Sequence, residues 1–271
     1  MNSMTSNASD NLRPAVSGWL LRGFYRFLTP YLRRNFHSIA MMRDSLSHAA
    51  VPADEPLILC ANHPSWWDPL TAQFLNQRLF PDRQFFAPID AEALEQYRVF
   101  AKLGFYGVRL HSSEGAAAFL KQSRAILHSG DAALWLTPEG RFADVRDHSA
   151  VLMPGMAHLC ARMQRGWVLP IAIEYVFWEE RLPECLFRIG EPVKIVDHPQ
   201  ASKLDWQTLL TEQMRKNQTV LSEHVVARDS QAFENLLTGA RGAGFVYDSM
   251  RRIKALVTGR RFKAAHGNKL Q

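Results

Sequence analysis

The sequence of 271 residues has few cysteines and no long hydrophobic run. Its three cysteines are Cys60, Cys160 and Cys185, and they lack the spacing of a metal site. We therefore expect a protein of a reducing compartment in which the cysteines act as small apolar side chains. No run of about 18 or more apolar residues occurs, so no membrane-spanning helix is predicted. The polar stretch from Met1 to Asp10 lacks the apolar segment of a signal peptide. We therefore expect a chain that is soluble or lies on a membrane without crossing it.

The remaining composition is typical of a folded protein. Hydrophobic residues make up 47% and charged residues 21%, which argues against disorder and collagen-like repeats. The length allows roughly one or two domains. The 32 Lys and Arg residues exceed the 26 Asp and Glu residues, giving a net charge of +6. This basic balance favours anionic partners such as nucleic acid, anionic lipid or phosphorylated small molecules.

The segment 11–43 contains no acidic residue and combines arginines with aromatic residues. The spacing predicts an amphipathic helix, with one side formed by Leu20, Phe24, Phe27 and Tyr31 and another by Arg22, Arg26 and Arg33. We expect Pro30 to divide it into two short helices. Such helices either lie in a membrane interface or pack on the protein's own core.

After residue 56, short apolar runs alternate with helical patterns. Strands are predicted at 56–61, 132–136, 167–177, 186–189 and 193–196, and helices at 90–102, 114–129, 154–163 and 205–228. This order predicts an α/β fold: a single layered domain with a mostly parallel mixed sheet flanked by helices. The expected organisation is amphipathic helices at 11–43, the α/β domain at 44–230 and a basic C-terminal tail at 231–271.

A histidine and an aspartate five positions apart follow the first of these strands. His63 is expected at the carboxyl edge of the sheet, where α/β proteins place their sites, and Asp68 before Pro69 is typical of a helix N-cap. The intervening turn can bring His63 onto Asp68, leaving Nε2 as a general base. The alternative without a catalytic role is that Asp68 only caps the helix and His63 is a polar loop residue. His224 and Asp229 have the same spacing within a helical pattern, so their side chains are expected to diverge.

Two further loops carry groups suited to an anion. Glu139, Gly140 and Arg141 follow the strand at 132–136 and offer a carboxylate, backbone N–H groups and a guanidinium. Arg109 ends a glycine-spaced strand at 104–108. Taken separately, each arginine is more typical of an ordinary turn or surface residue.

Taken in order, these segments resemble the glycerophospholipid acyltransferase family, whose best-known members are the 1-acyl-sn-glycerol-3-phosphate acyltransferases. The family pattern Asn-His-x-Ser-x-x-Asp is matched by Asn62, His63, Ser65 and Asp68. Three later blocks follow in the family order, at 104–109, 138–141 and 168–172, and residues 189–193 resemble the strand that commonly comes next. The resemblance covers roughly residues 40–200, and ordered blocks are more specific than any single one.

The resemblance implies acyl transfer from an acyl thioester, either acyl-CoA or an acyl carrier protein, to a lysophospholipid hydroxyl. It implies a catalytic pair of His63 and Asp68, with substrate binding by Asn62, Ser65, Arg109, Glu139, Gly140 and Arg141. Amides near Gly140 are expected to stabilise the oxyanion. No metal or redox cofactor is expected. The helices at 11–43 then favour peripheral, monotopic binding at the cytoplasmic face of a membrane, with the basic tail adding attraction to anionic lipid.

Two departures from the family pattern leave the acceptor open. The second block is one residue short, and the third lacks the Thr or Ser between Gly140 and Arg141. Because these blocks bind the acceptor's phosphate in the family, the alternative is a glycolipid, carotenoid or amino-acid-lipid hydroxyl. A different reading is a nucleic-acid-binding protein acting through the basic tail, but we expect no nucleic acid because the tail offers only Phe245, Tyr247 and Phe262 for stacking.

Overall fold

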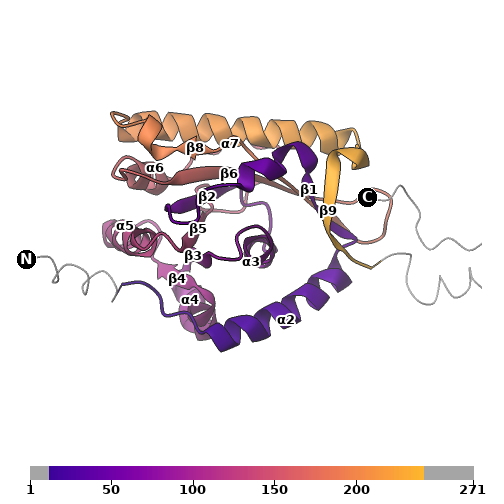
Figure 1. Ribbon diagram of the computed structural model, residues 1–271, viewed down its shortest axis with the longest axis horizontal. Coiled ribbons are helices and arrows are strands. Elements are labelled where there is room, and N and C mark those ends of the chain that lie inside the picture. Colours follow the sequence, from indigo (N-terminus) through magenta and orange to yellow (C-terminus); the bar gives the residue numbers. More distant parts are fainter. Residues whose placement is uncertain (1–11, 241–271) are drawn as a thin grey trace, which may run out of the picture.

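The computed structural model describes residues 12–240 as an α/β structure in which helices cover both faces of a sheet (Figure 1). The strands are β1 (Ser38–Met42), β2 (Leu57–Ala61), β3 (Gln84–Asp90), β4 (Phe105–Val108), β5 (Ala132–Leu136), β6 (Trp167–Val176), β7 (Glu184–Ile189), β8 (Val193–Lys194) and β9 (Phe233–Thr238). The helices are α2 (Gly18–Asn35), α3 (Asp68–Leu79), α4 (Ala91–Gln96), α5 (Ser113–His128), α6 (Gly155–Cys160) and α7 (Lys203–Val226).

Within residues 12–240 the nine strands form one mixed sheet in the order β4-β3-β5-β2-β6-β7-β1-β9, with β8 paired to β6. The part from β4 to β6 is parallel, β7 runs antiparallel to β6, and β1 is parallel to β7. The predicted fold class is therefore confirmed. Leu57 pairs with Ala133 on one side and Trp167 on the other, so β2 lies between β5 and β6.

Both faces of the central strand β2 are buried because side chains alternate between the two sides of a sheet. Leu57 and Leu59 pack into a core with residues of α2 and α3, whereas Ile58 and Cys60 pack into a second core with residues of α5, α6 and α7. A strand covered on both faces has a continuous run of apolar residues in its sequence, which is why a strand could be predicted at 56–61.

The prediction that Pro30 divides the first helix is wrong, because α2 continues from Gly18 to Asn35 with Pro30 inside it. An interior proline costs about 3 kcal/mol. Leu28 and Leu32, on either side of it, are completely buried, as is the following Phe36. Burial of each such side chain contributes roughly 1.5–3 kcal/mol, so the packing outweighs the proline.

The predicted boundaries at 43/44 and 230/231 pass through the sheet. β1 pairs with β7 and with β9, which brings strands from both flanking segments into the same sheet as the central region. Truncation at residue 43 would therefore remove a sheet strand and the buried side chains of α2. Residues 1–11 and the basic tail at 241–271 lie outside the described residues.

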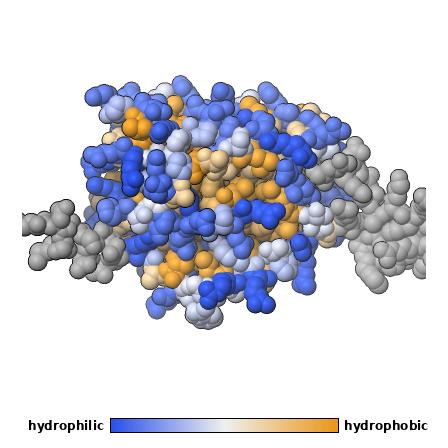
Figure 2. All heavy atoms as spheres, viewed as in Figure 1, coloured by the Kyte–Doolittle hydropathy of each residue, from blue (hydrophilic) through white to orange (hydrophobic). Residues whose placement is uncertain are grey.

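Other differences are local. The expected helix at 90–102 is α4 followed by a 3-10 segment, Arg98–Leu103, because Tyr97 leaves the helical conformation with φ −120° and ψ 62°. The strands β1, β3 and β9 were not predicted. No helix within residues 12–240 is both long and apolar enough to cross a membrane. Hydrophobic atoms gather on the face between α2 and α7, where α3 is seen nearly end-on (Figures 1 and 2).

Candidate active site

The carboxyl ends of three neighbouring strands bring the candidate residues together. His63 follows β2, Glu139 follows β5, and Tyr175 lies near the end of β6. Since β2 is paired in parallel with both β5 and β6, these ends meet at one edge of the sheet. This is the edge at which open α/β sheets carry their sites.

The predicted contact between His63 and Asp68 is confirmed. His63 Nδ1 lies 2.6 Å from Asp68 Oδ2, and Asp68 is only 4% exposed. The same oxygen accepts the Ser65 N–H at 3.1 Å. With Nδ1 bound to the carboxylate, Nε2 is the ring nitrogen left for a substrate, on a side chain that is 21% exposed.

The prediction that Asp68 is an N-cap is wrong. The helix α3 begins at Asp68 itself, and the N–H groups of Leu70 and Thr71 donate to the Trp67 carbonyl. Pro69, in the first turn, has no N–H that requires a partner. The carboxylate is therefore not used to cap the helix, which leaves it directed toward the preceding turn and His63.

Tyr175 holds the other oxygen of the aspartate and was not predicted as a site residue. Its hydroxyl donates to Asp68 Oδ1 at 2.7 Å and lies 3.0 Å from Thr71 Oγ1. Burial raises the pKa of Tyr175 well above its usual value, with the Asp68 charge adding to the effect, so the phenol stays neutral and can donate. The two residues are far apart in sequence and meet only through the tertiary structure.

The main chain of His63 is fixed by the loop after β5. Its N–H donates to Glu139 Oε2 at 2.9 Å, and its carbonyl accepts the Ala143 N–H at 3.0 Å. The second oxygen of Glu139 accepts from Arg215 Nη1 on α7, also at 2.9 Å. Glu139, which the resemblance implied would bind substrate, thus holds the His63 main chain and Arg215, a residue that the sequence analysis missed.

Asn62 and Ser65 are both engaged within the protein. Asn62 is 1% exposed, and its amide both donates to and accepts from the main chain of Ile173, which links β2 to β6. Ser65 Oγ accepts the Trp67 N–H at 3.3 Å. Asn62 is therefore placed to stabilise the strand end rather than to contact a substrate, unlike its predicted role.

The glycine of the Pro-Glu-Gly turn is required by the backbone, but its amide is occupied. Gly140 has φ +64°, a conformation that favours glycine, and its N–H donates to the Thr137 carbonyl at 3.0 Å. The Ala143 N–H is likewise bound, to His63. The expectation that amides near Gly140 stabilise an oxyanion therefore fails for these two N–H groups.

The two predicted arginines are exposed and lie at different distances from His63. The Arg141 side chain is 58% exposed and its Nη2 is 3.3 Å from Asp147 Oδ2. Arg109 is also exposed and follows β4, three strand positions from β2. Because neighbouring strands are about 4.8 Å apart, the main chain at Arg109 lies roughly 14 Å from the main chain at His63. Arg141 immediately precedes Phe142, whose ring is 4.5 Å from the His63 ring, whereas Arg109 lies three strand positions away.

An aromatic side chain packs beside the imidazole, and two tryptophans lie in the turn that follows it. The Phe142 ring is 4.5 Å from the His63 ring, and Phe142 is 57% exposed. Trp67 packs edge-on against buried Phe36, whereas Trp66 stacks on Trp67 and is 58% exposed. The exposed Phe142 ring therefore places apolar surface next to the His63 imidazole.

The prediction for the second histidine–aspartate pair is wrong. His224 Nδ1 lies 3.1 Å from Asp229 Oδ2, because α7 ends at Val226 and Arg228 turns the chain with φ +53°. Asp229 therefore lies beyond the end of the helix, and the turn brings its carboxylate back to the His224 ring. The pair is more open to solvent than His63 and Asp68, with side chains 37% and 42% exposed.

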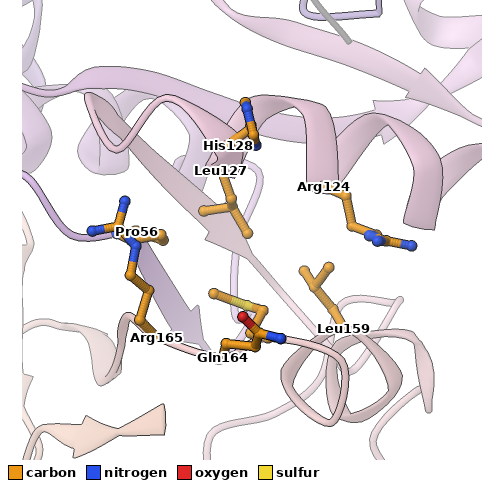
Figure 3. A pocket seen from close by; sticks show the side chains of 8 residues that line it. Pro56, Arg124, Leu127, His128, Leu159, Gln164 and Arg165 are labelled. Atoms are coloured by element: carbon orange, nitrogen blue, oxygen red, sulfur yellow. The ribbon is translucent and has the colours of Figure 1, made fainter. Parts of the chain in front are cut away.

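Two cavities in the described part of the chain lie elsewhere. One of about 260 Å³ is at the opposite edge of the sheet, where Pro56 precedes β2, and is bordered by Arg124 and Arg165 (Figure 3). The other, of about 540 Å³, lies between α2 and α3, beside Tyr25 and Gln84. Neither is lined by His63 or Asp68. In residues 12–240 no three His, Cys, Asp or Glu side chains converge as metal ligands.

Comparison with known proteins identifies one family. Residues 45–174 match the model of the family described as Acyltransferase. The match contains His63, Asp68 and Glu139, whereas Tyr175 and Arg215 lie beyond it. A search of curated proteins found no significant match.

Proposed function

We propose that the protein is an acyltransferase with a lipid-like acceptor and that His63 and Asp68 perform its chemistry, because residues 45–174 match the acyltransferase family model. The finer proposal is transfer from an acyl thioester, carried by CoA or an acyl carrier protein, to the hydroxyl of a lysophospholipid such as 1-acyl-glycerol-3-phosphate. The observation that carries it is the 2.6 Å contact from His63 Nδ1 to a buried carboxylate, which leaves Nε2 as a base.

In the proposed reaction, His63 Nε2 takes the proton of the acceptor hydroxyl as its oxygen attacks the thioester carbonyl. The tetrahedral intermediate collapses, the carbon–sulfur bond breaks, and the imidazolium returns the proton to the leaving thiolate. Asp68 holds the ring in one tautomer and stabilises the imidazolium. Tyr175 and the Ser65 N–H in turn hold the carboxylate.

The anionic part of a substrate has two arginines available. Arg141 is beside the site and Arg109 lies across the sheet edge, so a phosphate on the acceptor or on CoA can meet a guanidinium. A glycolipid, carotenoid or amino-acid-lipid hydroxyl remains the alternative acceptor. In that case, exchange of Arg141 for glutamine should leave the KM for the acceptor unchanged.

We also propose peripheral binding of the protein to the cytoplasmic face of a membrane. On α2, Trp19 is 70% and Phe27 58% exposed, and Arg22 and Arg26 are exposed as well. Exposed rings next to arginines suit the acyl boundary and the phosphates of a lipid surface. The inward face of the same helix, with Leu28 and Leu32, is buried in the core, so the proposed docking would use only the exposed face of α2.

The test is acyl transfer by the His63→Ala variant, followed as release of free CoA thiol from palmitoyl-CoA. With 1-acyl-glycerol-3-phosphate as acceptor, activity should fall by about 10³-fold or more, because general-base catalysis typically contributes 10²–10⁴-fold. An unchanged melting temperature would show that the fold is intact. Substantial activity in the folded variant would exclude His63 as the base.

A further inference from the structure

We propose that Arg215, on helix α7, is a positioning residue that sets the catalytic histidine through Glu139. This inference rests on the proposed role of His63 as the base. It assigns Glu139 to the protein's own framework and not to the acceptor, and it extends the site to a helix outside the matched range 45–174.

Both carboxylate oxygens of Glu139 are used within the protein. Oε2 accepts the His63 main-chain N–H and Oε1 accepts from Arg215, each at 2.9 Å. The Glu139 side chain is only 1% exposed. A carboxylate so enclosed has no face left for a substrate hydroxyl, so its effect on the reaction passes through the position of His63.

Arg215 is held at several points, which gives the Glu139 carboxylate a fixed location. Its Nη1 also donates to Gln218 Oε1, and its Nη2 donates to the Ala150 carbonyl, both at 2.8 Å. The Arg215 side chain is 12% exposed. The guanidinium therefore joins α7 to both ends of the loop that runs from Glu139 to Ala150.

The consequence for His63 is geometric. The imidazole must contact Asp68 through Nδ1 while Nε2 reaches the substrate, and His63 is attached at the end of β2 where the chain turns. Its main chain is bound only to this loop, through Glu139 and Ala143, in the hydrogen bonds of the described residues. A displacement of a reacting group by about 1 Å lowers rates about 100-fold, so loss of Arg215 should lower kcat.

The experiment compares Arg215→Met with Arg188→Met. Arg188, on β7, is a matched control because its side chain is also 12% exposed, and it too joins a carboxylate, Asp44, to a side chain of α7, Asn217. Lys216→Met, at the neighbouring exposed position, controls for loss of a charge on α7. For each variant, kcat and the KM values for palmitoyl-CoA and 1-acyl-glycerol-3-phosphate are measured, together with the melting temperature.

We expect kcat of Arg215→Met to fall about 30- to 100-fold with both KM values within about twofold, whereas the controls keep kcat within about twofold. Arg215→Lys should recover part of the loss, since an ammonium can pair with Glu139 but cannot also reach Gln218 and Ala150. In the folded variant, the low-field proton resonance of His63 Nδ1–H should weaken or move. Loss of thermal stability alone would not change that signal.

Three results would overturn the inference. One is an acceptor KM that rises with kcat unchanged, which would place Glu139 or Arg215 against the substrate. Another is an equal loss of kcat in Arg188→Met, which would indicate general destabilisation. The third is a normal kcat for Arg215→Met. If that variant does not fold, Arg215→Lys carries the same comparison. Activity in His63→Ala refutes the proposed function itself, whereas an inactive His63→Ala with a normal Arg215→Met refutes only the role of Arg215.

Discussion

Substitution of Asp68 by asparagine separates the charge of this residue from its geometry. Ser65 N–H is a fixed donor 3.1 Å from Oδ2, whereas the Tyr175 hydroxyl near Oδ1 can rotate and accept instead of donate. The amide oxygen of asparagine should therefore occupy the Oδ2 position and its NH2 group the Oδ1 position. In this arrangement His63 Nδ1–H keeps its acceptor, and the tautomer with a free Nε2 is preserved.

What Asp68→Asn loses is the negative charge beside the imidazolium. Two charges about 4 Å apart interact by about 4 kcal/mol at an effective dielectric constant of 20, and a charge-assisted hydrogen bond exceeds a neutral one by about 1 kcal/mol or more. Because the neutral amide still contributes its dipole, we expect the barrier to rise by about 2–4 kcal/mol, or roughly 30- to 1,000-fold in kcat. In Asp68→Ala, where the orientation of the His63 ring is also lost, kcat should fall by about 10³–10⁴-fold.

The assay is release of CoA thiol from palmitoyl-CoA under saturating acceptor. Asp229→Asn is the matched control, because it alters a histidine–aspartate pair of the same spacing, and its activity should stay within about twofold of the wild type. The reasoning is refuted if Asp68→Asn stays within about threefold of the wild type. It is also refuted if Asp68→Asn is as inactive as Asp68→Ala, since the amide would then have turned and imposed the other tautomer.

Three further predictions concern the surface, the pH dependence and the cysteines. Replacing Arg22 and Arg26 with alanine should weaken binding to vesicles containing phosphatidylglycerol about 30-fold, at about 1 kcal/mol per arginine. Replacement of Lys121 and Arg124 on α5, the opposite face, should have little effect in the same sedimentation assay, and equal losses would contradict docking through α2. Burial raises the pKa of Glu174 from 4.5 to about 7, despite its hydrogen bond with Ser222 and the nearby Arg146. The folded state binds the proton more tightly than the unfolded state, so stability should decrease as pH rises from about 4.5 to 7. Glu174→Gln should raise the free energy of unfolding at pH 8 by about 1–2 kcal/mol after allowance for solvent screening, and an unchanged pH profile in denaturant titrations would refute this. Burial, with a further effect of Glu139, raises the pKa of the Cys60 thiol to about 12, and Cys160 and Cys185 are buried and free as well. Iodoacetamide should therefore label none of the three thiols before unfolding, as measured by mass spectrometry, and labelling of the native protein would count against this core.

The agreement between sequence and structure is best where local pattern and tertiary environment act together. β5 coincides with the predicted strand at 132–136, and β2 differs from its prediction by one residue. Both strands were predictable because they are buried on two faces and so form continuous apolar runs. β1 and β9 were missed because they are short and adjoin polar or basic segments. Their strand conformation depends on pairing with each other and with β7.

Pro30 and Asp229 show the limits of local rules. The helix continues past Pro30 because burial of its neighbours outweighs the lost hydrogen bond, and that burial exists only in the folded chain. The helical spacing that separated His224 from Asp229 ceased to apply once Arg228 ended the helix. In both cases a correct local preference was overridden by packing or by a turn.

For the candidate site, the sequence alone determined the contact between His63, the proposed base, and Asp68. His63 and Asp68 lie five residues apart on a turn between a strand and a helix, so local geometry was sufficient to join them. Tyr175 and Arg215 come from β6 and α7, and no spacing rule links them to His63. Only the tertiary structure decided these contacts, because hydrogen bonds between distant segments depend on strand order and helix packing, which long-range burial sets.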